Sequence, residues 1–386
     1  MLDGRRLGVR LTERALTISI GDGEVLSWDL GGRLYSVWAD GRTWRRGLSG
    51  RAWEKGADAA GRRYRRPIDG AALDEVVEGA AARARGALAA LAGQDPVIAG
   101  RLERAARFDA AAARADSAAF NALYRDVGML PPDRYLSLVA ELTEGCSFHT
   151  CTFCDLYHEP FRVRSSEEFS RHLSSVRAFM GDSIALRGRS IFLGAANALA
   201  LPMPRLLQAL DIVADAFGPD RLQVSGFIDP KTAGRRTEAD YATLAAHGLG
   251  RVYLGLESGH DPLLAFVEKP GTAGDAVRGV AAAKAAGLHV AVIVILGLGG
   301  DRFDEAHVAD TAGALNAMPL GAGDIVYFSP LVEPAERPYA ALAEAAGIRP
   351  LDAEAQRAQR GRIRERLAFA GRPPQIATYD VGEFVY

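Results

Sequence analysis

The feature that most constrains the fold is a regular alternation, from about residue 131 onward, of short apolar runs and longer amphipathic segments. Short apolar runs predict buried strands, and apolar residues recurring every three or four positions predict helices. We expect strands at 135–142, 190–194, 222–227, 252–256, 290–296 and 324–328, and helices near 166–180, 204–217, 237–247, 273–286, 303–316 and 335–346. Six such units in sequence predict an α/β fold with a parallel sheet that curls into an open barrel, because each crossover returns over the sheet with the same hand.

The residues before this alternation predict a different architecture. Residues 16–20 and 25–28 alternate apolar and polar side chains around a Gly-Asp-Gly turn, which is typical of a small β-meander. From about residue 68 to 126 the chain is rich in Ala, Arg and Leu at helical spacing, until Pro131 and Pro132 break the pattern. We therefore expect a β-rich region at 1–66, a helical extension at 67–130, the barrel at 131–350 and a C-terminal extension at 351–386 that covers the barrel. Ser165 and Glu168 predict a capping box at the first barrel helix.

The three cysteines of the chain all fall within nine residues, as Cys146, Cys151 and Cys154. An odd number does not suit a disulfide framework. A closed zinc site needs four ligands, usually from two separated pairs, and the only nearby addition is His149, inside the loop between the first two cysteines. Iron–sulfur clusters use thiolates at short local spacings, and three thiolates on a four-iron cube leave one iron open for chemistry. The spacing therefore favours an iron–sulfur cluster over zinc.

The cysteine run resembles the motif of the radical S-adenosylmethionine (SAM) superfamily, Cys-x3-Cys-x2-Cys with an aromatic residue, here Phe153, before the last cysteine. The first gap is four residues rather than three, so no one subfamily's reaction carries over. The Gly-Leu-Glu-Ser-Gly segment at 255–259 looks like a widespread bacterial branch without an assigned reaction. Over residues 130 to 350, the resemblance implies a partial (β/α)6 barrel, a [4Fe-4S] cluster on Cys146, Cys151 and Cys154, bound SAM and an external one-electron reductant such as flavodoxin or ferredoxin.

In such folds ligands gather where the parallel strands end, so the residues that follow each strand are candidates for binding SAM. Gly194, Ala195 and Asn197 follow the second strand, where the family often has a Gly-Gly-Glu-like turn that holds the SAM amino group. That carboxylate is absent here, so Asn197 and nearby carbonyls would have to accept those hydrogen bonds. Glu257 ends the fourth strand and, as a carboxylate on an apolar strand, needs a donor. We favour a ribose diol or a substrate over an internal salt bridge to an arginine.

Weaker candidates lie around the same rim. Ser225, near the end of the third strand, is a candidate for ribose contact, and Gly297, after the fifth, would let the backbone approach adenine. Arg162 and Arg164 follow the cysteine loop and either meet the SAM carboxylate or cap the first helix. For Lys269, after the fourth strand, we favour a solvated loop position.

Composition limits the remaining possibilities. The net charge of −2 gives no general attraction to nucleic acid or anionic lipid. Residues 1–66 are locally basic, with 14 Lys and Arg against 8 Asp and Glu, and end in an Arg-rich run at 62–66 for which we favour a solvated turn over an RNA contact. No stretch of about 18 uncharged apolar residues occurs, so we expect a cytoplasmic protein with no membrane partner.

We therefore expect an enzyme that cleaves SAM reductively at a [4Fe-4S] cluster and abstracts hydrogen from a substrate, with a small molecule favoured. No cysteine remains for a second cluster, which disfavours sulfur insertion, and no cobalamin-binding signature precedes the barrel. The alternatives are a non-catalytic iron–sulfur or zinc-stabilised RNA-binding protein, or a radical SAM enzyme that modifies RNA.

Overall fold

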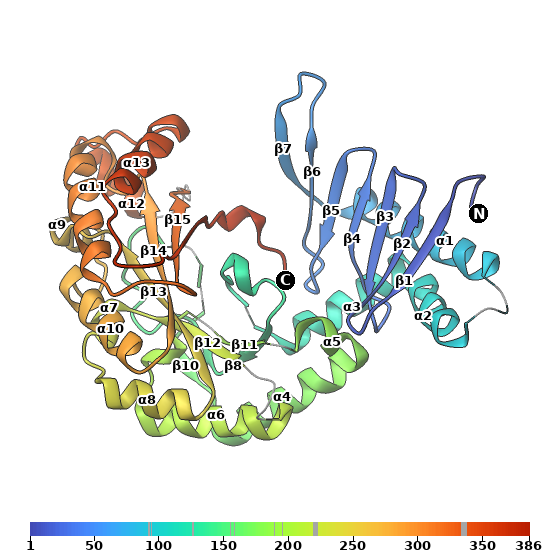
Figure 1. Ribbon diagram of the computed structural model, residues 1–386, viewed down its shortest axis with the longest axis horizontal. Coiled ribbons are helices and arrows are strands. Elements are labelled where there is room, and N and C mark those ends of the chain that lie inside the picture. The colour runs from blue at the N-terminus through green and yellow to red at the C-terminus, as the bar shows by residue number, and fades with distance from the viewer. Residues whose placement is uncertain are drawn as a thin grey trace.

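The computed structural model of the chain contains an antiparallel sheet with three helices at the N-terminus and a parallel α/β sheet after it (Figure 1). The structure describes residues 1–91, 93, 95–125, 127–154, 156–157, 159–188, 190–194, 196–218, 223–332 and 338–386. Among the helices of this described part, none is long and apolar enough to cross a membrane.

The N-terminal sheet is a seven-stranded meander in which every strand pairs with its neighbour in sequence. Its strands are β1 (Leu7–Leu11), β2 (Ala15–Ile20), β3 (Glu24–Asp29), β4 (Leu34–Ala39), β5 (Arg42–Arg46), β6 (Ala52–Ala57) and β7 (Arg63–Ile68). The expected meander is thus present and larger than the sequence pattern indicated. The alternation in β2 turns Leu16, Ile18 and Ile20 to one face, where they are fully buried.

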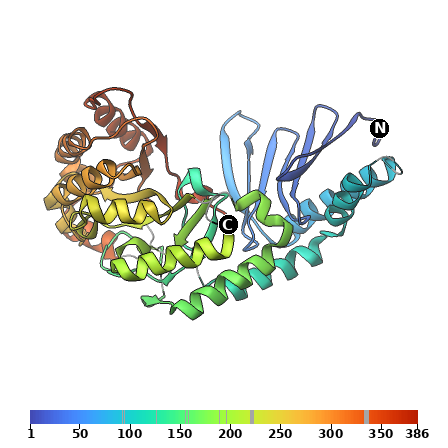
Figure 2. The same ribbon diagram turned by 60° about the horizontal axis from the view of Figure 1, so that its bottom comes forward.

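Three helices cover that apolar face (Figure 2). They are α1 (Gly70–Ala90), α2 (Pro96–Arg107) and α3 (Ala110–Leu123). Small residues such as Ala80 and Ala84 on α1 pack against the sheet, so the alanine-rich composition reflects close packing. Asp95 and Asp109 accept hydrogen bonds from backbone N–H groups and cap α2 and α3.

The second sheet is parallel throughout, in the order β16-β15-β14-β13-β12-β11-β8. Its strands are β8 (Leu138–Glu141), β11 (Ser190–Gly194), β12 (Gln223–Ile228), β13 (Leu249–Glu257), β14 (His289–Leu296), β15 (Ile325–Pro330) and β16 (Gln375–Thr378). This confirms the expected α/β fold with an open parallel barrel, and the six expected strands are its first six in sequence. Residue 222, expected to start one strand, lies outside the described residues.

The barrel helices confirm the expected alternation. The main ones are α4 (Ser166–Met180), α6 (Met203–Phe217), α8 (Glu238–Ala246), α10 (Ala273–Ala285), α11 (Gly300–Ala317) and α12 (Pro338–Ala345). Residues 335–337, expected to begin the last of these, lie outside the described residues. Short helices not foreseen are α5 (Ile184–Arg187), α7 (Pro230–Ala233) and α9 (Asp261–Phe266). The capping box of Ser165 and Glu168 is present at α4.

The C-terminal extension adds to the parallel sheet one strand that was not expected from the sequence. After α13 (Ala353–Glu365), β16 pairs in parallel with β15 and extends the sheet at that edge. The short η5 turn (Val381–Glu383) follows and returns the chain to the N-terminal domain, where the Ser49 N–H donates to the carbonyl of Tyr386 at 2.7 Å.

The expectation of a solvated turn at 62–66 is wrong for most of that run. Residues 63–66 belong to strand β7, which pairs with β6. Arg65 forms ion pairs with Asp380 and Glu383, and Arg66 forms one with Glu54. Ion pairs with carboxylates thus hold Arg65 and Arg66 in place. Two of these carboxylates, Asp380 and Glu383, lie far away in the sequence.

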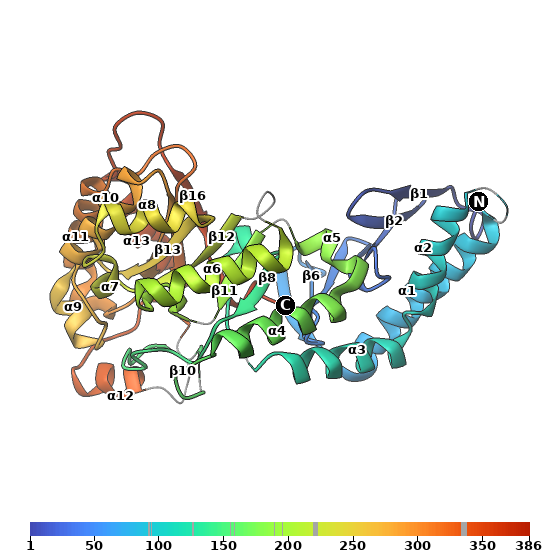
Figure 3. The same ribbon diagram turned by 90° about the horizontal axis from the view of Figure 1, so that it is seen from below.

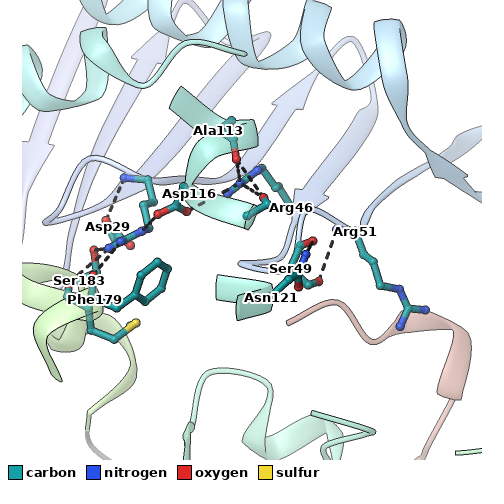
Figure 4. A network of polar contacts seen from close by, with 12 residues as sticks. Asp29, Arg46, Ser49, Arg51, Ala113, Asp116, Asn121, Phe179 and Ser183 are labelled. Carbon is teal, nitrogen blue, oxygen red and sulfur yellow. Dashed lines mark hydrogen bonds and ion pairs between the residues drawn. The ribbon is translucent and has the colours of Figure 1, made fainter. Parts of the chain in front are cut away.

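A network around Arg33 connects the two domains. It lies where α3 packs beside α4 (Figure 3), and Figure 4 labels its members Asp116, Phe179 and Ser183. Arg33 donates from Nε to Asp116 Oδ1 of α3 at 2.8 Å. Its other nitrogens donate to Ser183 Oγ at 2.6 Å and to the Phe179 carbonyl at 2.8 Å, both on the barrel side. Both side chains of the Arg33–Asp116 pair are largely buried. One guanidinium therefore satisfies acceptors from both domains.

We predict that Arg33→Ala destabilises the protein by about 3 kcal/mol, because it leaves the largely buried Asp116 carboxylate with only the longer ion pair to Arg46 at 3.8 Å. Urea unfolding measures the change, and limited proteolysis reports whether the two domains separate. The matched control is Arg62→Ala, which removes an exposed pair with Asp58 and should change stability by about 1 kcal/mol or less. Equal effects of the two substitutions would contradict the role assigned to Arg33.

Candidate functional site

A cavity lies at the carboxyl ends of the parallel strands. All three cysteines line it, together with Phe153. Its polar residues come from several strand ends and the loops after them: Asn197, Asp229, Glu257, Lys269 and Ser329. Much of the remaining wall is apolar or aromatic, including Phe148, Phe227, Ile293, Ile295 and Tyr379. Of the residues expected at the site, the structure thus brings together Cys146, Cys151, Cys154, Phe153, Asn197 and Glu257.

The cysteine loop is closed at its base and attached to the loop after α9. Strands β9 (Thr143–Glu144) and β10 (Arg162–Val163) pair antiparallel on either side of it. Gly145 has φ 66°, and a Cβ there would lie 2.2 Å from the Glu159 carbonyl, so glycine is required at this position. The Thr152 N–H donates to the Val267 carbonyl at 3.1 Å, and the Thr150 hydroxyl donates to the Glu268 carbonyl at 2.9 Å. These contacts hold the part of the loop that carries Cys151 and Cys154 against the segment that follows α9.

The thiols lie in a mainly apolar environment. Burial raises the pKa of Cys151 to about 12 and also raises the pKa of Cys154, and nearby Lys269 opposes both shifts. His149, considered as a fourth ligand, is exposed and is not among the residues that line the cavity. Within the described ranges, no group of three His, Cys, Asp or Glu side chains is arranged to hold a metal ion. The assignment of the cysteines to a cluster therefore remains a prediction.

Asn197 and Asp229 form a hydrogen-bonded pair between the ends of β11 and β12. Asn197 Nδ2 donates to Asp229 Oδ2 at 2.8 Å, and the Asp229 N–H donates to Asn197 Oδ1 at 2.9 Å. Asn197 Nδ2 also lies 3.0 Å from Ser147 Oγ of the cysteine loop. Asp229 was not among the expected site residues because the expected strand ended at residue 227 rather than at Ile228. Asp229 supplies a carboxylate to a rim where the Gly194–Asn197 turn has none.

Glu257 and Lys269 form a buried ion pair in the wall of the cavity. Lys269 Nζ donates to Glu257 Oε1 at 2.8 Å, and the side chains are 11% and 10% exposed respectively. Burial alone would lower the pKa of Lys269, but the Glu257 carboxylate and the neighbouring Cys151 raise it above its usual value. The expectation of a solvated Lys269 is therefore wrong. The sequence did offer a signal for this pair. A buried carboxylate at the end of β13 needs a cation, and Lys269 follows that strand by only twelve residues.

The backbone at this strand end is shaped around the carboxylate. Glu257 has φ 61°, a conformation that residues other than glycine rarely adopt, and the register with β14 shifts between Gly255 and Glu257. A Cβ at Gly255 would lie 2.4 Å from Glu257 Oε1. Strain of this kind concentrates at functional sites, and here it directs Glu257 into the cavity wall.

Of the other expected site residues that the structure describes, none lines the cavity. Gly194 is buried in β11, and Ser225 is fully buried, with its hydroxyl 3.5 Å from the Ile191 carbonyl. The Gly297 N–H donates to Gln359 of α13 at 2.8 Å. Arg162 pairs with Glu144 and Glu168, and Arg164 pairs with Glu141 and Glu144. Ala195 lies outside the described residues.

The side chains of the cavity suit an iron–sulfur cluster with SAM beside it. Three thiolates are the ligands that such clusters use. Asp229 and Asn197 offer acceptors for an ammonium group, and Lys269 is a cation that can attract a carboxylate. The aromatic and aliphatic wall suits the flat, less polar part of a nucleoside.

Comparisons with known proteins agree with this interpretation. Residues 140–312 match the Radical SAM superfamily, so the chain contains a radical SAM domain of the kind that binds a [4Fe-4S] cluster and SAM. No curated protein matches.

Solved structures with some likeness include three enzymes. Apo OxsB, a cobalamin-dependent S-adenosylmethionine radical enzyme, is 16% identical over 57% of this chain and 30% of that chain, with a TM-score of 0.39. Methylornithine synthase (PylB) is 15% identical over 79% of this chain and 84% of that chain, with a TM-score of 0.41. Coproporphyrinogen III oxidase (HemN) from Escherichia coli is 11% identical over 64% of this chain and 54% of that chain, with a TM-score of 0.42. The chain thus spans under a third of the length of OxsB.

We predict that Lys269→Met destabilises the cluster-free protein by about 3–5 kcal/mol, because it leaves the Glu257 carboxylate buried without a cation. The double substitution Lys269→Met with Glu257→Gln should recover most of this loss. Urea unfolding measures all three proteins. Arg349→Met is the control, since Arg349 pairs with Asp301 while 87% exposed; it should cost about 1 kcal/mol or less. A double variant no more stable than Lys269→Met would refute the pairing argument.

Proposed function

We propose that the chain is a radical SAM enzyme that holds a [4Fe-4S] cluster on Cys146, Cys151 and Cys154 and acts on a small-molecule substrate. The observation that carries the proposal is that these three thiols, the only ones in the chain, line one cavity with the polar strand ends. When bound and reduced, the cluster and SAM supply a 5′-deoxyadenosyl radical able to remove hydrogen from a substrate. An external reductant such as flavodoxin or ferredoxin would provide the electron.

The residues of the chain would bind and orient SAM through opposite charges. Asp229, held by Asn197, would accept hydrogen bonds from the SAM amino group, the role expected from the sequence for Asn197 and nearby carbonyls. Lys269 is placed to attract the SAM carboxylate, and Glu257 has a second oxygen that can accept from a ribose hydroxyl. Gly194, Ser225, Gly297, Arg162 and Arg164 have no part in this proposal, because none of them lines the cavity.

The apolar wall contributes by excluding water. Phe153, Ile293 and Ile295 surround the polar groups, and the C-terminal extension adds Tyr379 and Val381. A dry site strengthens the charged hydrogen bonds to SAM and limits side reactions of a reactive species.

A small molecule is favoured over RNA as substrate because the Arg-rich run offers little free charge. Arg65 and Arg66 are paired with carboxylates in β7, and Arg62 is paired with Asp58. An RNA substrate would need cations available to neutralise phosphates.

We predict that the protein, reconstituted with iron and sulfide without oxygen, binds about four iron atoms per chain. After reduction it should convert SAM to 5′-deoxyadenosine, measured by chromatography. Alanine at Cys146, Cys151 or Cys154 should reduce the product to background, because each substitution removes a ligand from the cluster. His149→Asn is the control and should retain the activity, because His149 lies in the same loop but is exposed and does not line the cavity. An intact cluster that yields no 5′-deoxyadenosine would refute the proposed function.

We predict that Asp229→Asn weakens SAM binding by about tenfold to a hundredfold, because the negative charge opposite the SAM ammonium group is lost. Asparagine still caps α7, so the fold should be preserved. Equilibrium binding of SAM to the cluster-loaded protein measures the effect, with electron paramagnetic resonance confirming the cluster. Asp310→Asn is the control, an exposed aspartate paired with His260. Unchanged affinity in Asp229→Asn would remove Asp229 from the binding site.

A further inference from the structure

A second chamber opens beside the cavity and brings a residue of the N-terminal domain to the site. The chamber shares Phe153, Cys154, Ile295 and Ser329 with the cavity, so the two are contiguous. Arg51 of the N-terminal domain lines the chamber but not the cavity. The chamber thus extends from a cysteine that we assign to the cluster to the turn between β5 and β6.

Most of the chamber wall is apolar, with Ser329, Cys154 and Arg51 as its polar side chains. Leu331 and Phe384 are typical of its wall, and Arg51 is the only charged side chain among the described residues that line it. Such a space suits a ligand with an apolar body, and the single cation sets the charge that the ligand must carry at one end. An ammonium group or a polyanion would fit these walls poorly.

Arg51 is presented by an anchored turn. The Ser49 N–H donates to the Tyr386 carbonyl at 2.7 Å, and Asn121 Nδ2 of α3 donates to the Ser49 carbonyl at 3.2 Å. Arg46, at the end of β5, donates to the Ala113 carbonyl at 2.7 Å and is buried against α3. Both sides of the turn are thus fixed, which reduces the entropic cost of placing Arg51 against a ligand.

The Arg51 guanidinium differs from three other arginines of its domain in having no partner among the described residues. Arg46, Arg65 and Arg66 each contact a carboxylate or a carbonyl. For Arg51, no side-chain hydrogen bond or ion pair occurs within the part of the chain that the structure describes. Figure 4 shows its side chain extending away from the contact between Ser49 and Asn121. Its donors are therefore available to a ligand.

We propose that Arg51 binds a carboxylate or phosphate group of the substrate, whose apolar body fills the chamber and reaches the cavity. The proposal rests on the proposed function, and it gives the N-terminal domain a role in substrate selection. The substrate class is a mainly apolar small molecule with an anionic end.

The test compares decanoate with decanol, which share a tail and differ in charge. Isothermal titration calorimetry on the cluster-loaded protein with SAM should show at least about tenfold tighter binding of decanoate, as expected for a charge-assisted contact. Arg51→Met should remove this preference, and Arg51→Lys should keep part of it. The control Arg45→Gln changes an exposed arginine of β5 outside the chamber and should keep the full preference.

A second variant locates the binding. Leu331→Trp fills the chamber and should weaken decanoate and decanol by the same factor, at least about tenfold if most of the apolar contact is lost. The inference is overturned if wild-type protein shows no preference for decanoate, if Arg51→Met retains the preference, or if Leu331→Trp binds both compounds as wild type does. Formation of 5′-deoxyadenosine by the wild type is measured in parallel. A wild type without that activity refutes the proposed function, whereas an active wild type without the preference refutes only the role of Arg51.

Discussion

Parallel pairing of β8 and β11–β16 brings the carboxyl ends of all these strands to one rim, and every group assigned to the site depends on it. The cysteine loop follows the end of β8 by way of β9, Asn197 and Asp229 follow β11 and β12, and Glu257 ends β13. These residues lie far apart in the sequence and contribute to one cavity only because each crossover returns in the same direction. The sheet thus determines where polar groups can be concentrated in an otherwise apolar barrel.

Charge compensation is the second requirement, because carboxylates and thiols gathered in an apolar cavity are costly. Lys269 meets this requirement by pairing with Glu257 and lowering the cost of negative charge on the cysteines. The positive φ of Glu257 and the glycine at 255 indicate that the backbone is adapted to this pair. The ion pair therefore links the shape of the β13 end to the electrostatics of the cysteine loop.

Local patterns predicted the barrel well because burial on both faces gives each strand a continuous apolar run. The strand at 190–194 and the helix at 166–180 agree with the structure to the residue. Some candidate site residues, such as Ser225 and Gly297, do not line the cavity. They show the limit of predicting site residues from the expected ends of strands. Side chains alternate between the two faces of a strand, so an error of one residue in a strand end changes which residue faces the ligand. Asp229 was missed for this reason, since its strand ends one residue later than expected.

The N-terminal domain escaped functional interpretation for a different reason. No motif marks Arg51, and its position depends on contacts with segments remote in sequence, Asn121 and Tyr386. Its neighbours Arg65 and Arg66 looked equally available in sequence, yet each pairs with a carboxylate in the structure. Only tertiary structure distinguishes an arginine used for stability from one left with free donors. The domain junction formed by Arg33 therefore matters beyond stability, because it fixes where the N-terminal domain, and with it Arg51, lies against the barrel.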